Sequence, residues 1–268
     1  MVRVGLVGCG TIGTQVALAI QRRYARQARV IALHDQTHAN ALRLQRRLRH
    51  PSRIVSLPQL ILASDLVIEA ASSRIAADVA RRALRARRDV MIMSAGGLLG
   101  SRAWRRAAAS GRGRLLVPSG ALAGLDGVRA LAVGSIRSLR LTTSKPPRAL
   151  VGADYVRRRG IRLTGLKRPR VLFEGSPSAA VKAFPQNTNV AAAMALSSGA
   201  PERRMRVRVI ADPRLRVNVH ELTAEGDCGR VSCRIESRPS ANPKTSELAV
   251  RSAIAALARL FDPVTVGT

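Results

Sequence analysis

The sequence predicts an α/β protein in which an N-terminal, doubly wound parallel sheet is followed by a second, α+β domain with an open mixed sheet. A glycine motif follows the first apolar run, and apolar runs then alternate with amphipathic helices up to about residue 118. Beyond this point the expected strands become alternating and charged, which favours a mostly antiparallel or mixed sheet. We therefore expect two domains.

The first expected element is a buried strand that ends in a glycine-rich turn. The turn has the spacing G-x-G-x-x-G and comprises Gly8, Gly10, Thr11, Ile12 and Gly13. In a dinucleotide-binding turn the first glycine permits a tight bend, the second lets the backbone approach a pyrophosphate, and the third lets the helix pack closely on the strand. The helix N-terminus then directs N–H groups at the phosphates. We expect these five residues to contact a cofactor.

An acidic residue after the next strand supports this interpretation. Val16, Ile20 and Tyr24 recur every four residues in the helix after the turn, and a second apolar run then ends beside Asp35. In a Rossmann fold an acid at this distance hydrogen-bonds the adenosine ribose. Asp35 would also repel a 2′-phosphate, and residues 36–38 include no arginine. The sequence therefore predicts NAD as the cofactor, with NADP possible.

The alternation of helices and strands continues to the end of the dinucleotide-binding domain, which we place at residues 1–118. Ligands of such sheets lie at the carboxyl ends of the strands, so we expect Ala71 and Ser72 to contact the cofactor. The expected helices cover 38–48, 57–63 and 75–87 and one begins at Ser101, and the expected strands cover 53–55, 66–70, 90–93 and 115–117.

The second domain is expected at residues 119–245 and is interpreted as the catalytic, substrate-binding and dimerisation domain. A closing helix within 246–268 is expected to pack back on the first domain. The expected strands are 138–143, 171–174, 206–210, 215–222 and 230–235, and the expected helices are 178–184, 189–197 and 246–260.

The charge of the chain is strongly positive but evenly spread. Residues 1–120 hold 21 basic and 5 acidic side chains, and the remainder holds 25 and 11, which together give a net charge of +30. With only three Phe, two Tyr and one Trp, the chain has few platforms for stacking bases. We interpret the charge as a solvated arginine surface and expect no specific nucleic-acid partner.

Cysteine usage and hydropathy indicate a cytoplasmic protein. The three cysteines, Cys9, Cys228 and Cys233, are odd in number and form no C-x-x-C pair, so we expect neither a disulfide framework nor a metal site. No stretch reaches the roughly 20 apolar residues of a membrane span, and no signal peptide is recognisable. We expect no membrane partner.

His220 is the candidate for proton transfer. A strand places Asn218, His220 and Leu222 on one face, and an imidazole has a pKa near neutrality. A lone histidine in a strand is also often a satisfied core residue. Asn218 beside it favours a site, and we expect Asn218 to contact the substrate.

Two polar segments could bind an acidic substrate through hydroxyls and ammonium groups. The loop expected after the strand ending at 143 supplies Ser144 and Lys145, and the segment before the last helix supplies Lys244, Thr245 and Ser246. The alternatives are an ordinary turn and an ordinary helix N-cap, for which Thr245 or Ser246 is suited.

Seven motifs in this order resemble the L-aspartate dehydrogenase family nearly from end to end. They are Val-Gly-Cys-Gly-Thr-Ile-Gly at 7–13, Glu-Ala-Ala-Ser at 69–72, Pro-Ser-Gly-Ala-Leu-Ala-Gly-Leu-Asp at 118–126, Thr-Thr-Ser-Lys-Pro-Pro at 142–147, Phe-Pro-Gln-Asn-Thr-Asn-Val-Ala-Ala at 184–192, Asn-Val-His-Glu-Leu at 218–222 and Asn-Pro-Lys-Thr-Ser at 242–246.

This resemblance implies an enzyme that uses NAD or NADP to oxidise L-aspartate to iminoaspartate, which yields oxaloacetate and ammonia or enters NAD biosynthesis. It implies that His220 is the active-site residue and that Ala121 and one of Asn187 and Asn189 contact the cofactor. We expect a homodimer. The alternatives are a related dehydrogenase acting on another amino acid such as homoserine, and a non-catalytic protein that senses dinucleotides or binds polyanions.

Overall fold

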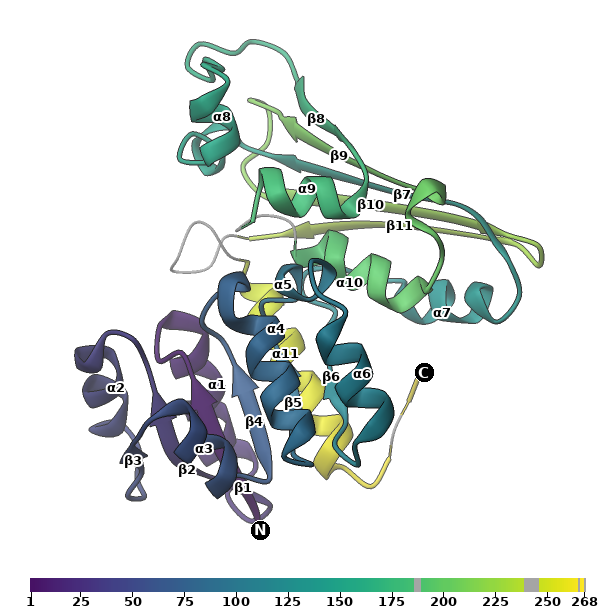
Figure 1. The fold of residues 1–268 in the computed structure, drawn as a ribbon. Helices are drawn as coiled ribbons and strands as arrows, with labels where there is room; N and C mark the ends of the chain where they lie inside the picture. Colours follow the sequence, from purple (N-terminus) through teal and green to yellow (C-terminus); the bar gives the residue numbers. More distant parts are fainter. Residues whose placement is uncertain (186–188, 239–245, 265, 268) are drawn as a thin grey trace. The chain divides into compact units, whose positions relative to one another are not determined.

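The computed structural model shows two compact units, each described here by itself. One unit comprises residues 1–118 and 250–265, and the other comprises residues 119–249 and 266–268 (Figure 1). The residues that the structure describes are 1–185, 189–238, 246–264 and 266–267.

The first unit contains a six-stranded sheet in the order β3-β2-β1-β4-β5-β6. Every pairing in it is parallel, which confirms the doubly wound sheet. The strand order changes direction between β1 and β4, the place where such folds bind ligands. The strands are β1 (Val2–Val7), β2 (Ala28–His34), β3 (Arg53–Ile54), β4 (Leu66–Glu69), β5 (Asp89–Ile92) and β6 (Leu115–Leu116).

The helices of this unit follow the expected alternation with small differences. The second helix stops at residue 45 rather than 48, and a short helix that the sequence did not predict lies at 96–99, where two glycines hide the periodicity. The helices are α1 (Thr11–Arg23), α2 (His38–Gln45), α3 (Leu57–Ala63), α4 (Ser73–Arg85), α5 (Gly96–Leu99) and α6 (Ala103–Ser110).

The closing helix, α11 (Glu247–Phe261), completes the core of the first unit. Ala253 and Leu257 are fully buried in the same apolar cluster as β1 and α1. The rings of Tyr24 and Phe261 lie 5.2 Å apart between their centroids. Residues at the two ends of the sequence therefore share one core.

The second unit contains a five-stranded sheet in the order β11-β10-β7-β9-β8. The β7–β9 pairing is parallel and the others are antiparallel, so the sheet is mixed, as expected. The strands are β7 (Ile136–Lys145), β8 (Arg170–Gly175), β9 (Met205–Ala211), β10 (Asn218–Gly226) and β11 (Arg230–Ser237). The helices are α7 (Leu125–Val133), α8 (Asp154–Arg158), α9 (Pro177–Ala183) and α10 (Asn189–Ser198), with 3₁₀ turns at Pro147–Ala149 and Glu202–Arg204.

The two faces of this sheet differ in character. Helices α7 and α9 contact one face and α10 packs beside both of them (Figure 1). Leu139, Leu141 and Leu222 are buried on that face. The other face is open and charged, and Arg234 forms ion pairs with Glu221 and Glu236 there. This alternation is the pattern of a half-buried sheet.

Two expected boundaries in the second unit were wrong, and both bear on the site. The strand expected to end at 143 continues to Lys145, because the polar run Thr-Thr-Ser-Lys pairs with β9 and β10 before Pro146 ends the strand. The strand expected at 215–222 begins at Asn218, since the Leu215 N–H closes a turn onto Asp212 O.

Candidate functional site

The glycine turn of the first unit has the geometry that dinucleotide binding requires. Gly8 has φ +93, and a Cβ there would lie 2.6 Å from the carbonyl carbon of Ala70. A Cβ on Gly13 would collide with the Gly8 carbonyl oxygen, whereas a Cβ on Gly10 would meet nothing within 4 Å. The first and third glycines are therefore needed for folding, and the second borders open space in which a pyrophosphate fits.

That open space belongs to a cavity of about 430 Å³ at the N-terminus of α1. No side chain caps the helix there, so its first N–H groups are available to an anion. The cavity is lined by Cys9, Gly10, Thr11, Thr14, Gln15, Asn40, Arg43, Leu44 and Arg47. The residues present thus fit a dinucleotide phosphate.

Asp35 follows β2, as expected, and ties the glycine turn to α2. Its carboxylate accepts the Cys9 N–H at 2.7 Å, the Thr37 N–H at 2.7 Å and the Asn40 side-chain N–H at 3.5 Å. Burial, with a smaller effect of the Asp35 charge, raises the pKa of the Cys9 thiol to about 12. The thiol therefore stays protonated beside the turn.

Glu69 is a buried acid at the end of β4 that the sequence interpretation missed as a functional residue. One of its carboxylate oxygens accepts the N–H groups of Ala71 at 2.8 Å and Ser72 at 2.9 Å, and the other accepts the Ser94 N–H at 3.1 Å. Burial raises the pKa of the carboxyl, against the effect of these hydrogen bonds. Glu69 thus fixes the loop that carries Ala71 and Ser72. An acid ending an apolar parallel strand was the available signal.

The second unit carries a buried polar cluster on the covered face of its sheet, at the end of β7. Thr143 lies opposite His220, and Asn218 lies opposite Ser237. The exposed fraction of every member is 4% or less. We call these residues the polar cluster: Thr143, Lys145, Asn218, His220 and Ser237.

The electrostatics of the polar cluster keep its histidine neutral. Burial, and then the positive charge of Lys145, lower the pKa of His220 to about 3. Burial lowers the pKa of Lys145 to about 8. The Nδ1 atom of His220 is 3.1 Å from Thr143 Oγ1, which leaves Nε2 for a ligand. Near neutral pH the cluster therefore presents a neutral imidazole and a largely protonated ammonium group.

Two further atoms of the polar cluster are available to a polar ligand. Among the described residues, Asn218 Oδ1 and Ser237 Oγ are buried and have no hydrogen-bond partner. Buried polar atoms are nearly always paired, and these two atoms, on the same face of the sheet as Lys145 and His220, fit a polar ligand. The sequence did not predict Ser237 as a site residue, because the other residues of its strand have the pattern of a solvent-exposed edge strand.

Not every expected substrate contact joins the cluster. Ser144 lies on the opposite face of β7 from Thr143 and Lys145, because side chains alternate along a strand. Ser246 Oγ accepts the Ala249 N–H at 3.1 Å, so it caps α11. Lys244 and Thr245 lie outside the described residues, and so does Asn187.

The other expected cofactor contacts of the second unit lie near one another. Ala121 is buried and follows Gly120, which has φ +67. A Cβ on Gly120 would lie 3.9 Å from Val190 Cγ1. The 119–121 turn therefore adjoins the first turn of α10, which begins at Asn189.

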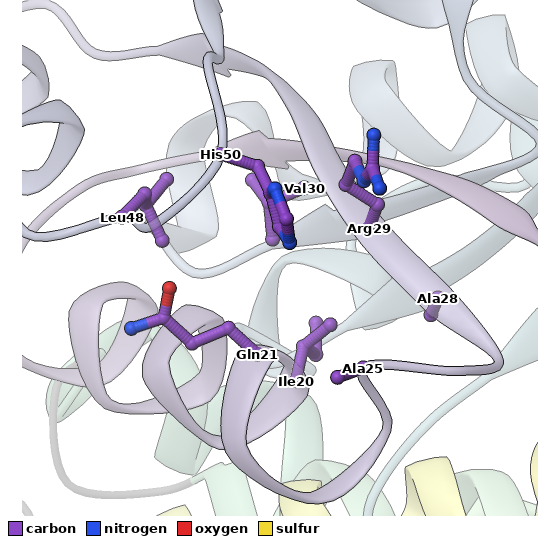
Figure 2. A pocket seen from close by; sticks show the side chains of 8 residues that line it. All are labelled: Ile20, Gln21, Ala25, Ala28, Arg29, Val30, Leu48 and His50. Atoms are coloured by element: carbon purple, nitrogen blue, oxygen red, sulfur yellow. The ribbon is translucent and has the colours of Figure 1, made fainter.

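A second hollow of the first unit is too small for a substrate. It has a volume of about 20 Å³, room for about one water molecule. Figure 2 shows Gln21 and His50 at its edge and the apolar side chains of Ile20 and Val30 beside them.

No group of three or more potential metal-ligating side chains occurs within the described part of the chain. No helix there is long and apolar enough to cross a membrane.

The glycine turn on a parallel sheet and the polar cluster on a separate mixed sheet define a two-domain, dinucleotide-dependent dehydrogenase fold. Two family models match in agreement with it: "Homoserine dehydrogenase, NAD binding domain" over residues 8–118 and "Aspartate dehydrogenase, C-terminal" over residues 126–260. The second covers half of the sequence. The chain belongs to the aspartate dehydrogenase family.

Individual relatives agree with this assignment. The chain is 50% identical over 145 residues to L-aspartate dehydrogenase of Methanosarcina barkeri, covering 54% of this chain and 53% of the relative. It is 40% identical over 144 residues to L-aspartate dehydrogenase of Bradyrhizobium diazoefficiens, covering 54% and 51%. The match thus spans about half the length of these curated relatives.

Solved structures show the same fold. The crystal structure of aspartate dehydrogenase from Thermotoga maritima matches with a TM-score of 0.76 at 24% identity and covers 100% of both chains. A putative myo-inositol dehydrogenase from Sinorhizobium meliloti matches with a TM-score of 0.52 at 15% identity, covering 99% of this chain and 91% of its own.

Proposed function

We propose that the chain oxidises L-aspartate with NAD or NADP to iminoaspartate, which water converts to oxaloacetate and ammonia. The polar cluster carries this proposal, because it combines a buried cation, a neutral base and two unpartnered polar atoms. The relatives named L-aspartate dehydrogenase support the choice of substrate. When bound, the nicotinamide accepts the hydride that leaves Cα of aspartate.

In this proposal Lys145 and Ser237 bind the carboxylates of aspartate. A buried ammonium group has lost its hydration, so an anion gains more from pairing with it than with an exposed lysine. The Ser237 hydroxyl can donate to the second carboxylate, and Asn218 Oδ1 can accept an N–H from the substrate amine. All three atoms lie on one face of the sheet, which orients the substrate for reaction.

His220 acts as the base in this proposal. For Nε2 to accept a proton, Nδ1 must carry one and donate it to Thr143 Oγ1. Nε2 then takes a proton from the substrate ammonium, or later from the water that attacks the imine. A carboxylate bound at Lys145 offsets the positive charge that helps to lower the pKa of His220. Substrate binding therefore strengthens the base.

The proposed cofactor contacts include the glycine turn of the first unit. The glycine turn supplies N–H groups at the start of α1 for the phosphates. The Ala71 and Ser72 N–H groups are held by Glu69, so these two residues contact the cofactor through their other atoms. The residues that we propose as contacts are Gly8, Gly10, Thr11, Ile12, Gly13, Asp35, Ala71, Ser72, Ala121 and Asn189.

The test is a spectrophotometric screen of amino acids with each cofactor, comparing the unmodified chain with His220→Ala. We expect aspartate to give the highest rate and the substitution to lower kcat by about 10²- to 10⁴-fold, with cofactor binding unchanged. His50→Ala, at an exposed histidine of the other unit, is the matched control. A higher rate with homoserine would identify homoserine, not aspartate, as the substrate. Full activity of His220→Ala would show that His220 is not the catalytic base.

We also propose a homodimer in the cytoplasm. The open face of the five-stranded sheet offers a surface for a second copy, and the exposed thiol of Cys228 suits a reducing compartment. Light scattering coupled to gel filtration tests the first statement, and cell fractionation tests the second. A monomer at micromolar concentration, or a secreted protein, would contradict them.

A further inference from the structure

We infer that the cavity at the N-terminus of α1 holds a 2′-phosphate through Arg43 and Arg47, so that this chain favours NADP over NAD. The inference rests on the dinucleotide binding proposed above and deepens it by naming the residues that select the cofactor. It reverses the expectation from Asp35 alone.

The cavity adjoins the pyrophosphate turn and is positively charged. Its wall comes from Cys9, Gly10 and Thr11 on one side and from α2 and the turn after it on the other. Arg43 and Arg47 contribute two guanidinium groups, and no acidic side chain lines the cavity. With a volume of about 430 Å³ it is large enough for a ribose phosphate.

The two arginines are placed and available to bind a phosphate together. They are four residues apart, and the Arg47 N–H bonds Leu44 O at 2.9 Å, so the chain keeps a helix-like turn between them. Both are exposed, and neither forms an ion pair within the part of the chain that the structure describes. A guanidinium binds phosphate oxygens through two parallel N–H groups.

Asp35 does not oppose a phosphate here as a free carboxylate would. Both of its oxygens accept N–H groups, from Cys9 on one side and from Thr37 and Asn40 on the other. These donors spread its negative charge, and Asp35 does not line the cavity. Two cations facing the ligand therefore outweigh one acid that already has partners.

The experiment measures the binding of two adenosine probes to the full-length chain by calorimetry. Adenosine 2′,5′-bisphosphate carries the additional 2′-phosphate, and adenosine 5′-monophosphate does not. We expect the bisphosphate to bind at least about tenfold more tightly. Arg43→Gln and Arg47→Gln should each remove about tenfold of that preference and leave the affinity for the monophosphate unchanged. NADPH and NADH fluorescence titrations should show the same difference.

Arg46→Gln is the matched control, because Arg46 lies between the two arginines, is exposed and does not line the cavity. It should change neither affinity. Equal binding of the two probes by the unmodified chain would overturn the inference. The inference would also be overturned if Arg46→Gln reduced the preference for the bisphosphate as much as Arg43→Gln and Arg47→Gln do. It would be overturned as well if those two variants lost affinity for both probes equally. Since no amino acid is present, these results are independent of whether the chain oxidises aspartate.

Discussion

Replacing Lys145 with Met should stabilise the protein while removing its proposed substrate binding. Burial lowers the pKa of Lys145 from 10.5 to about 8, and each pKa unit corresponds to about 1.4 kcal/mol. The buried charge thus destabilises the folded state by about 3 kcal/mol near neutral pH. Methionine has a similar length and no charge, so Lys145→Met should recover up to this amount.

The pH dependence gives the sign of the effect. Below pH 8 both the folded and the unfolded states are protonated at Lys145, and the folded state carries the full penalty. Between pH 8 and 10.5 the folded state has lost the proton and the unfolded state still binds it, so stability rises with pH. The advantage of Lys145→Met should therefore shrink across this range and disappear above it.

Urea unfolding followed by circular dichroism at several pH values measures this difference. Trp104 is the only tryptophan and lies in the first unit, so its fluorescence assigns the transition of that unit. Lys182→Met, at an exposed lysine of the second unit, is the control and should show no such pH dependence. A variant that is less stable than the unmodified chain at pH 7, or a difference independent of pH, would refute the reasoning.

Three further predictions concern the remaining site residues. Gly10→Ala should leave the unfolding midpoint unchanged and weaken NADPH binding in a fluorescence titration, whereas Gly13→Ala should lower the midpoint. A lower midpoint for Gly10→Ala than for Gly13→Ala would contradict the roles of the two glycines. Glu69→Gln replaces an acceptor of a buried N–H with a donor, and should reduce the free energy of unfolding by about 1–3 kcal/mol and weaken cofactor binding; unchanged values for both would show that Glu69 fixes nothing. Thr143→Val removes the partner of His220 Nδ1 and should lower kcat for aspartate about tenfold at constant KM in steady-state kinetics. An unchanged kcat would show that Thr143 does not set the tautomer of His220.

Local patterns were sufficient to predict the first sheet and its glycine turn. Helical periodicity and glycine spacing depend on near neighbours in sequence. Asp35 lies 26 residues from its partner Cys9, but one strand-helix-strand unit joins them, so the motif spacing was sufficient to place it. The role of Glu69 could have been predicted from the sequence, because a carboxylate in a buried apolar strand needs hydrogen-bond donors. Arg43 and Arg47 could not be recognised as cavity residues, because residues 43–49 include four arginines and only the fold shows which of them line the cavity.

The polar cluster shows where sequence reasoning was limited by strand geometry. His220 and Lys145 were identified, but Ser144 was chosen as their neighbour where the structure has Thr143. A strand reverses the direction of its side chains at each residue, so the choice depended on recognising that β7 continues to Lys145. The polar run at 142–145, followed by two prolines, favours a loop by composition. In the structure these residues pair with β9 and β10 and therefore form a strand.

The position of α11 in the core of the first unit has a consequence for how the protein is made. Residues 1–118 leave the ribosome before residues 119–249, but Ala253 and Leu257 complete the apolar core of the first unit. During translation the exposed apolar side of β1 and α1 must therefore wait while the whole second unit is synthesised. Such delayed closure slows folding and exposes the nascent chain to aggregation. If synthesis stopped before residue 250, the sheets of both units would have been translated, but the first unit would lack the core residues Ala253 and Leu257.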